Sequence, residues 1–190
     1  MVKIGFIVEG HCEKAVLGSD AFQDYLSKTG ILNVHDIQNA KGKSNLLNDT
    51  SKSLAQIIRD KGAQHILVLR DLDDLPNAET AKNEVIKADD ISVCVAIREL
   101  EAWFLADSAT ISTIFKTSFF CEFPEHESDP LETLNKLSRQ FRQGRGIDDK
   151  RKFTNLMLAH GFTIQQAARH PNCPSAAYFL STLQTLASAN

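Results

Sequence analysis

The chain has 190 residues, of which 43% are apolar and 24% are charged. At about 150 residues per domain this length favours one domain. The composition excludes collagen-like, low-complexity and wholly disordered proteins. The formal net charge of -3 excludes a protein that coats nucleic acid through bulk positive charge, so any contact with nucleic acid must be local.

Cysteine spacing and hydropathy indicate the cellular setting. The four cysteines form no CxxC pair, and the chain opens directly on a strand-like run without the features of a signal peptide. No apolar run reaches the roughly 18 residues of a membrane span. We therefore expect a cytoplasmic protein with reduced thiols and no membrane partner.

Four short apolar runs predict strands, at residues 3–8, 33–38, 65–70 and 91–98. Three of the runs are β-branched and apolar on both faces, which is typical of buried parallel strands. The strands end near residues 9, 38, 70 and 98, so the steps are 29, 32 and 28 residues. This spacing is that of repeated βαβ units. We predict an α/β fold with a Rossmann-like, mainly parallel open sheet of about four strands flanked by helices.

Helices are expected between the strands and throughout the C-terminal third. Amphipathic patterns predict them at residues 13–28, 44–61, 78–87, 100–115, 130–141, 150–160, 163–169 and 175–187. The most specific start is Asp129-Pro130 with Glu132, which combines an N-cap, an N1 proline and a capping box. We predict an α/β core at residues 1–110 and a helical extension at 111–190 that packs on it as one compact domain.

Acidic residues follow three of the four predicted strands. Glu9 follows the first strand, Asp71 and Asp73 the third, and Glu99 and Glu101 the fourth. Ligands of open α/β sheets bind beyond the carboxyl ends of the strands. Because side chains alternate along an extended backbone, we expect Asp71 and Asp73 to leave on the same side and share one ion.

Clustered carboxylates require a compensating cation. Like charges about 4 Å apart repel by roughly 1 kcal/mol in water and roughly 4 kcal/mol at an effective dielectric of 20. All-oxygen ligation favours Mg²⁺ or Mn²⁺, which activate water or clamp phosphate oxygens. We predict that Glu9, Asp71 and Asp73 converge on one such ion, which requires the first and third predicted strands to be neighbours at their carboxyl ends. The alternative is that these acids are helix caps or loop residues, with Glu99 or Glu101 paired to Arg98 or Arg70.

Three motifs carry a resemblance to a known family. The segment VEGHCE at residues 8–13 resembles the VEGxxE opening of the TOPRIM domain, the catalytic module shared by topoisomerases, bacterial primases and OLD-family nucleases. The segment LVLRDLDD at residues 67–74 resembles its DxD strand. The segment ELEAWFLAD at residues 99–107 is similar to one in a family of small, uncharacterised bacterial TOPRIM-like proteins related to the OLD nucleases. With the terminal CPSAAYFLSTL, the resemblance covers most of the chain and implies a TOPRIM-type sheet.

The resemblance also implies residue roles. Glu9 would act as general acid/base or metal ligand, and Asp71 and Asp73 would bind Mg²⁺. Candidates for a second metal are Glu13, Glu99 and Glu101. The site would hold one or two Mg²⁺ or Mn²⁺ ions. Cys12 departs from the family pattern, which more usually has a small hydroxyl residue there.

Glycine and basic residues are candidates for phosphate contact. Gly10 would let a phosphate approach the backbone closely, and Lys41 and Lys43 lie in a loop where phosphates bind in many α/β proteins. Residues 136–152 carry seven bases and two acids, and we expect this strip to contact nucleic acid, with solvated surface as the alternative. Its candidates are Arg142, Arg145, Lys150 and Lys152, and one of the two lysines would reach the metal site to neutralise transition-state charge.

Two functional hypotheses of different classes follow. The first is a metal-dependent phosphodiesterase, a nuclease acting on DNA or RNA, in which Glu9, Asp71, Asp73 and Lys150 are catalytic. The second is a catalytically silent TOPRIM-like module that binds nucleic acid or a partner ATPase in prokaryotic defence, including phage defence. A homodimer is left open. A haloacid-dehalogenase-type phosphatase is disfavoured, because its nucleophilic Asp lies on the first strand and Leu75 stands where a Thr-like residue is needed.

Overall fold

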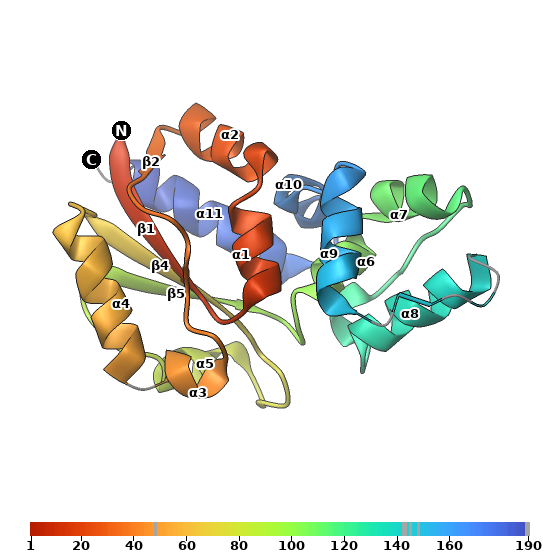
Figure 1. The fold of residues 1–190 in the computed structure, drawn as a ribbon, viewed down its shortest axis with the longest axis horizontal. Coiled ribbons are helices and arrows are strands. Elements are labelled where there is room, and N and C mark those ends of the chain that lie inside the picture. Colours follow the sequence, from red (N-terminus) through yellow and green to blue (C-terminus); the bar gives the residue numbers. More distant parts are fainter. Residues whose placement is uncertain (48, 142–143, 145, 148, 189–190) are drawn as a thin grey trace.

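A parallel sheet with helices on both faces forms the first part of the molecule (Figure 1). The computed structural model describes residues 1–47, 49–141, 144, 146–147 and 149–188. The sheet has five strands in the order β2-β1-β4-β5, with β3 also paired to β1. The predicted α/β fold with a mainly parallel open sheet is confirmed. The strands are β1 (Val2–Val8), β2 (Ile31–Asn33), β3 (Gln38–Asn39), β4 (His65–Asp71) and β5 (Ile91–Ala96).

Strand pairing brings the predicted acidic strand ends to one edge of the sheet. Strand β1 pairs with β4 from Ile4↔His65 to Val8↔Leu69, and β4 pairs with β5 up to Asp71↔Ala96. The expectation that the first and third predicted strands are neighbours is therefore confirmed. The chain winds outward to β2 on one side of β1 and to β4 and β5 on the other. Open α/β sheets bind ligands at the point where the direction of winding changes in this way.

The predicted strand at residues 33–38 is wrong in its middle. Strand β2 pairs with the start of β1, and β3 pairs with its end, at Ile7↔Gln38 and Val8↔Asn39. The backbone N–H of Val34 still donates to the carbonyl oxygen of Ile4 at 3.1 Å, but the next three residues leave the ladder, and Ile37 is buried in the core with 4% of its surface exposed. The edge strand is thus two short segments, which shortens the unpaired edge that the sheet presents.

Two helical layers cover the sheet. On one face lie α1 (His11–Leu17), α2 (Asp20–Lys28) and α11 (Pro174–Ser188), and on the other lie α3 (Lys43–Leu46), α4 (Asp49–Asp60) and α5 (Ala78–Glu84). Along β1, Phe6 packs into the first layer and Ile7 into the second. This alternation between two buried faces explains why the strand is apolar at successive positions.

Three of the predicted helices are each two helices in the structure. The segment 13–28 divides into α1 and α2 at Ser19, whose hydroxyl accepts a hydrogen bond from the backbone N–H of Phe22 at 3.4 Å. The segment 100–115 divides into α6 (Glu101–Ala106) and α7 (Ser108–Phe115) at Asp107. Oδ1 of Asp107 caps α7 by accepting a hydrogen bond from the backbone N–H of Thr110 at 3.1 Å. The segment 44–61 divides into α3 and α4. Capping residues inside apolar-periodic segments therefore mark the breaks at Ser19 and Asp107.

The C-terminal third is helical, as predicted. It contains the short 3-10 helix η1 (Pro124–His126) and the helices α8 (Pro130–Phe141), α9 (Lys150–Ala159) and α10 (Ile164–Ala168), which lie beyond the carboxyl edge of the sheet (Figure 1). One apolar cluster runs from Phe6 of β1 through Trp103 and Phe153 to Phe179 of α11. The helices thus share a core with the sheet. Among the described helices, none has the length and apolarity to cross a membrane.

Candidate metal centre

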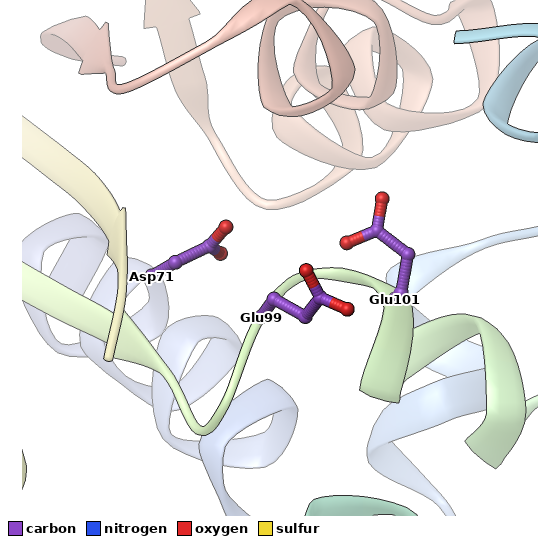
Figure 2. Close-up of side chains that lie close together, drawn as sticks. All are labelled: Asp71, Glu99 and Glu101. Atoms are coloured by element: carbon purple, nitrogen blue, oxygen red, sulfur yellow. The ribbon is translucent and has the colours of Figure 1, made fainter. Parts of the chain in front are cut away.

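Three carboxylates gather where β4 and β5 end. Asp71 is the last residue of β4, Glu99 lies in the segment after β5, and Glu101 is the first residue of α6. Each offers one carboxylate oxygen, and these oxygens lie within 4.8 Å of one another. Figure 2 shows the three side chains converging from two adjacent segments. Asp71 and Glu101 are buried, with 6% and 0% of their surface exposed, so bulk water does little to screen their repulsion. We call these three residues the acidic triad.

Lys150 lies among the oxygens of the acidic triad. As the first residue of α9, it places its Nζ 2.9 Å from Oε2 of Glu101, 3.3 Å from Oε2 of Glu99 and 3.6 Å from Oδ2 of Asp71. Burial by itself would lower the pKa of Lys150, but the carboxylates of Asp71 and Glu101 outweigh burial and raise it. The lysine therefore stays charged, and one ammonium group faces three carboxylates.

Backbone donors hold two carboxylates of the acidic triad. Oδ1 of Asp71 accepts a hydrogen bond from the backbone N–H of Leu100 at 2.9 Å, directly before α6. Oε1 of Glu99 accepts one from the backbone N–H of Leu131 at 3.0 Å, in the first turn of α8. In each of these two residues, one carboxylate oxygen caps a helix and the other faces Lys150. The capping explanation and the cluster explanation both hold for the same residues.

Glu9 and Glu13 add negative charge beside the triad. Burial raises the pKa of Asp71 well above its usual range, and the charges of Glu13, Glu101 and Glu9 raise it further. Burial also raises the pKa of Glu101 to about 7, although Lys150 opposes the shift. Burial, and next the charge of Asp73, raise the pKa of Glu9. In the absence of a bound cation, these carboxyl groups therefore retain protons more readily than ordinary ones.

Four buried carboxylate oxygens have no hydrogen-bond partner within the described part of the chain, although one of them, Oε2 of Glu101, is ion-paired with Lys150. The other three are Oε2 of Glu9, Oε2 of Glu13 and Oε1 of Glu101. A buried acceptor without a donor is uncommon in folded proteins, and a coordinated cation satisfies such an oxygen as a donor would. The donor set is all oxygen, which suits a hard divalent cation such as Mg²⁺ or Mn²⁺. These residues therefore fit a metal centre.

The expectation that Asp71 and Asp73 leave the same side of an extended backbone is wrong. Strand β4 ends at Asp71, and Asp73 has a left-handed backbone with φ of 52°. The Asp73 carboxylate accepts a hydrogen bond from Nζ of Lys43 at 3.1 Å. Neither Glu9 nor Asp73 belongs to the group of three whose oxygens meet. Glu99 and Glu101, proposed from the resemblance for a second ion, join Asp71 instead.

The predicted phosphate contacts fall into three groups. Lys43 and Lys150 are engaged with carboxylates, whereas Lys41 and Lys152 are exposed. A Cβ added at Gly10 would come within 2.9 Å of Oε2 of Glu13, so a carboxylate of the same chain already approaches this glycine closely. Arg142 and Arg145 lie outside the described residues. The basic strip is therefore divided, because Lys150 turns inward to the acidic triad while Lys152 stays exposed on the same helix.

Left-handed residues follow three strands at this edge. They are Lys41 after β3, Asp73 after β4 and Arg98 after β5, with φ values of 62°, 52° and 64°. Such conformations cost about 1 to 3 kcal/mol each in a non-glycine residue and cluster at functional sites. From the sequence, Arg98 was expected only as a salt-bridge partner of an acid. Its place directly before Glu99, at the end of a strand, was the signal that could have marked it.

The four cysteines are free thiols. Burial raises the pKa of Cys12 to about 11, although Thr154 opposes the shift, so this thiol beside the site stays neutral at neutral pH. In the absence of a metal ion it therefore lacks the thiolate that a nucleophile needs.

Comparisons with known proteins leave the site to be interpreted from its own chemistry. No protein-family model, no curated protein and no solved structure matches the chain. The established points are an α/β fold with a parallel sheet and a buried acidic triad that could hold a metal ion.

Proposed function

We propose that this protein is a divalent-metal-dependent phosphodiesterase that cleaves nucleic acid. The acidic triad carries this assignment, because three carboxylate oxygens within 4.8 Å of one another form an oxygen-rich cation site at the switch point of an open α/β sheet. One ammonium group, that of Lys150, faces them, and further acids lie beside it. A divalent cation would supply the missing positive charge.

The residues of the site divide into roles by position. Asp71, Glu99 and Glu101 would hold Mg²⁺ or Mn²⁺, and such an ion activates water and neutralises charge on a phosphoryl group. Lys150 would stabilise the negative charge that develops during phosphoryl transfer. Glu9, whose buried Oε2 lacks a hydrogen-bond donor within the described residues and whose pKa is raised by burial, would accept or donate a proton. Glu13 would support a second ion.

The motif resemblance supports the same assignment. Glu9 and Glu13 come from the segment that resembles the TOPRIM opening, Asp71 from the DxD-like strand, and Glu99 and Glu101 from the segment similar to the OLD-related family. All three segments meet at one edge of the sheet. A nuclease with this site would act in prokaryotic defence, alone or with a partner ATPase.

Lys150 favours the alternative of a catalytically silent binding module. Its ammonium group lies within 3.6 Å of an oxygen of every member of the acidic triad, so it occupies space that an ion would need. If the lysine is a permanent internal counter-ion, the triad is structural. A binding measurement separates the two explanations, because an ion that binds must compete with Lys150 or lie to one side of it.

The test uses Asp71→Asn, with Asp24→Asn as its matched control. The amide oxygen of the substituted side chain can still accept the hydrogen bond from the Leu100 backbone N–H, so the variant removes charge while keeping the helix cap. Asp24 is exposed on α2. We expect wild type and Asp24→Asn to bind Mn²⁺, measured by the loss of the free-ion paramagnetic resonance signal, and to cleave labelled DNA or RNA. Asp71→Asn should bind Mn²⁺ at least about tenfold more weakly, which corresponds to about 1.4 kcal/mol, and should not cleave.

Two results would contradict the assignment. Equal cleavage by wild type and Asp71→Asn, after rigorous purification, would assign the activity to a contaminant. Absence of Mn²⁺ binding by the wild type would leave the acidic triad as a salt-bridge network and favour the binding module.

A further inference from the structure

A cleft opens beside the acidic triad. It has a volume of about 320 Å³ and is lined by Asp73, Asp74, Arg98, Glu99 and the segment from Ser128 to Leu131. Glu99 belongs to both the cleft and the triad, with Oε2 facing Lys150 and Oε1 bonded to the backbone N–H of Leu131. A molecule bound in the cleft would therefore lie directly against the proposed metal centre.

Most charged groups of the cleft and its surroundings already have partners. Asp73 accepts from Lys43 at 3.1 Å, and Glu99 contacts Lys150 at 3.3 Å. Asp129 accepts a hydrogen bond from the backbone N–H of Glu132 at 2.8 Å, where it caps α8. The two lysines Lys43 and Lys150 are thus held by carboxylates, and each would have to leave a carboxylate to bind a ligand.

Arg98 is different. Within the described part of the chain its guanidinium group makes no hydrogen bond and no ion pair, although acidic residues line the same cleft. Its backbone is fixed, because its carbonyl oxygen accepts a hydrogen bond from the backbone N–H of Asp73 at 2.8 Å. The residue is half-buried and left-handed. A cation is thus held at the cleft without satisfying any group of the described chain.

We propose that Arg98 binds a backbone phosphate of a single-stranded nucleic acid lying in this cleft, next to the phosphate at the metal centre. This inference rests on the proposed function, and it names the group that holds the substrate. A guanidinium group offers parallel N–H donors that match two phosphate oxygens, which a lysine cannot do. A single strand suits a small cleft, since it can bend its backbone into a space that a duplex cannot enter.

Because the cleft is lined by acidic residues, we do not expect the basic strip alone to hold a nucleic-acid strand there. An acidic cleft repels phosphate, and this repulsion is reduced by a cation that contacts the strand and reduced further by a cation at the triad. Lys150 is occupied and Lys152 is exposed on α9. Arg98 supplies the contact at the cleft itself. Binding of a strand should therefore depend on Arg98 more than on Lys152.

The experiment measures binding of fluorescein-labelled oligothymidylate by fluorescence anisotropy, with Ca²⁺ replacing the catalytic ion to suppress cleavage. The proteins are wild type, Arg98→Ala, Arg98→Lys and the control Arg169→Ala, whose residue is exposed beyond α10. We expect Arg98→Ala to bind about tenfold more weakly, as loss of one charge-assisted contact predicts. Its slope of log affinity against log salt should fall by about 0.7, the value for one phosphate of a single strand.

The remaining variants define the result. Arg98→Lys should keep the salt slope but recover only part of the affinity, since it keeps the charge and loses the paired donors. Arg169→Ala should match wild type. Arg98→Ala should bind Mn²⁺ at least as tightly as wild type does, because the variant keeps every member of the acidic triad and removes a nearby positive charge, and this also shows that the site remains folded.

Failure of this inference and failure of the proposed function give different results. Equal affinity and slope for wild type and Arg98→Ala, or no binding of the oligonucleotide by the wild type, would overturn the role of Arg98 even if Mn²⁺ binds at the triad. Arg98-dependent oligonucleotide binding without Mn²⁺ binding would support the role of Arg98 and reject the metal-dependent enzyme.

Discussion

The two edges of the sheet are built differently. At the amino edge, the left-handed turns before β2 and β4 contain Gly30 and Gly62, and a paired Arg59 and Asp90 link α4 to the start of β5. At the carboxyl edge, the left-handed positions are Lys41 with its neighbour Gly42, Asp73 and Arg98. Within the described residues, the buried carboxylates of this edge outnumber the cations that contact them. The amino edge thus has glycine at its left-handed positions and a paired arginine and aspartate, whereas the carboxyl edge has non-glycine residues at such positions and an excess of buried carboxylates. Such departures from local preference concentrate where a protein binds or reacts, at a cost in stability.

Removal of Lys150 should have the largest effect on this contrast. In the presence of a metal chelator, Lys150→Met should lower the free energy of unfolding by roughly 3 kcal/mol, because buried carboxylates lose the ammonium group that faces them. Mn²⁺ should raise the melting temperature of this variant more than that of wild type. The control is Lys152→Met, an exposed position two residues further along α9. Equal denaturant stability of the two variants would mean that the triad is not strained by its own charge.

A substitution at the amino edge should have an intermediate effect. Gly62 has φ of 84°, and a Cβ added there would meet no atom within 4 Å, so only the backbone opposes a side chain. Gly62→Ala should therefore destabilise the protein by about 1 kcal/mol in urea unfolding. Lys41→Gly, at φ of 62° on the other edge, should have the opposite sign. Changes of the same sign in both variants would remove the distinction between the edges.

The ion pair of the amino edge should have the smallest effect. Arg59 donates to Asp90 at 2.7 and 2.8 Å, but the two side chains are 33% and 30% exposed, so solvent screens the pair. Asp90→Asn should cost about 0.5 kcal/mol at neutral pH. The guanidinium group holds the pKa of Asp90 below its usual value, so the stabilisation is present above the unfolded pKa and is lost as pH falls through the folded pKa. The difference between wild type and variant should therefore disappear in acid, and a difference that persists there would assign it to another cause.

Local signals in the sequence predict the sheet and several helix starts. The buried runs of β1, β4 and β5 are read from continuous apolar residues, and Asp129, Pro130 and Glu132 fix the start of α8 because the capping box is a local motif. The breaks at Ser19 and Asp107 were missed because the apolar period continues across them. A capping side chain in such a segment was the signal that could have located each break.

The edge that holds the site was predictable, but its composition was not. Topology brings the ends of β1, β4 and β5 together, so acids after these strands must be neighbours. Which of them meet depends on the left-handed turn at Asp73, and the sequence has no glycine there to signal it. Similarly, Lys150 and Lys152 are equivalent in sequence, and only the packing of α9 directs Lys150 inward. The side-chain contacts of the site therefore depend on how helices that are distant in the sequence pack together, which local sequence patterns do not reveal.

The hydrogen bonds from Leu100 and Leu131 to the acidic triad also bear on entropy. Asp71 and Glu99 are each held by one backbone donor, so their side-chain rotamers are fixed when the helices form. Immobilising a flexible side chain on binding costs about 0.5 to 1.5 kcal/mol, so two side chains fixed in advance spare a ligand about 1 to 3 kcal/mol. An arriving ion would meet oxygens that have already lost their freedom of rotation, and its affinity would be higher by roughly five- to 150-fold. The starts of α6 and α8 thus set how tightly the opposite oxygens of the same carboxylates can bind a cation.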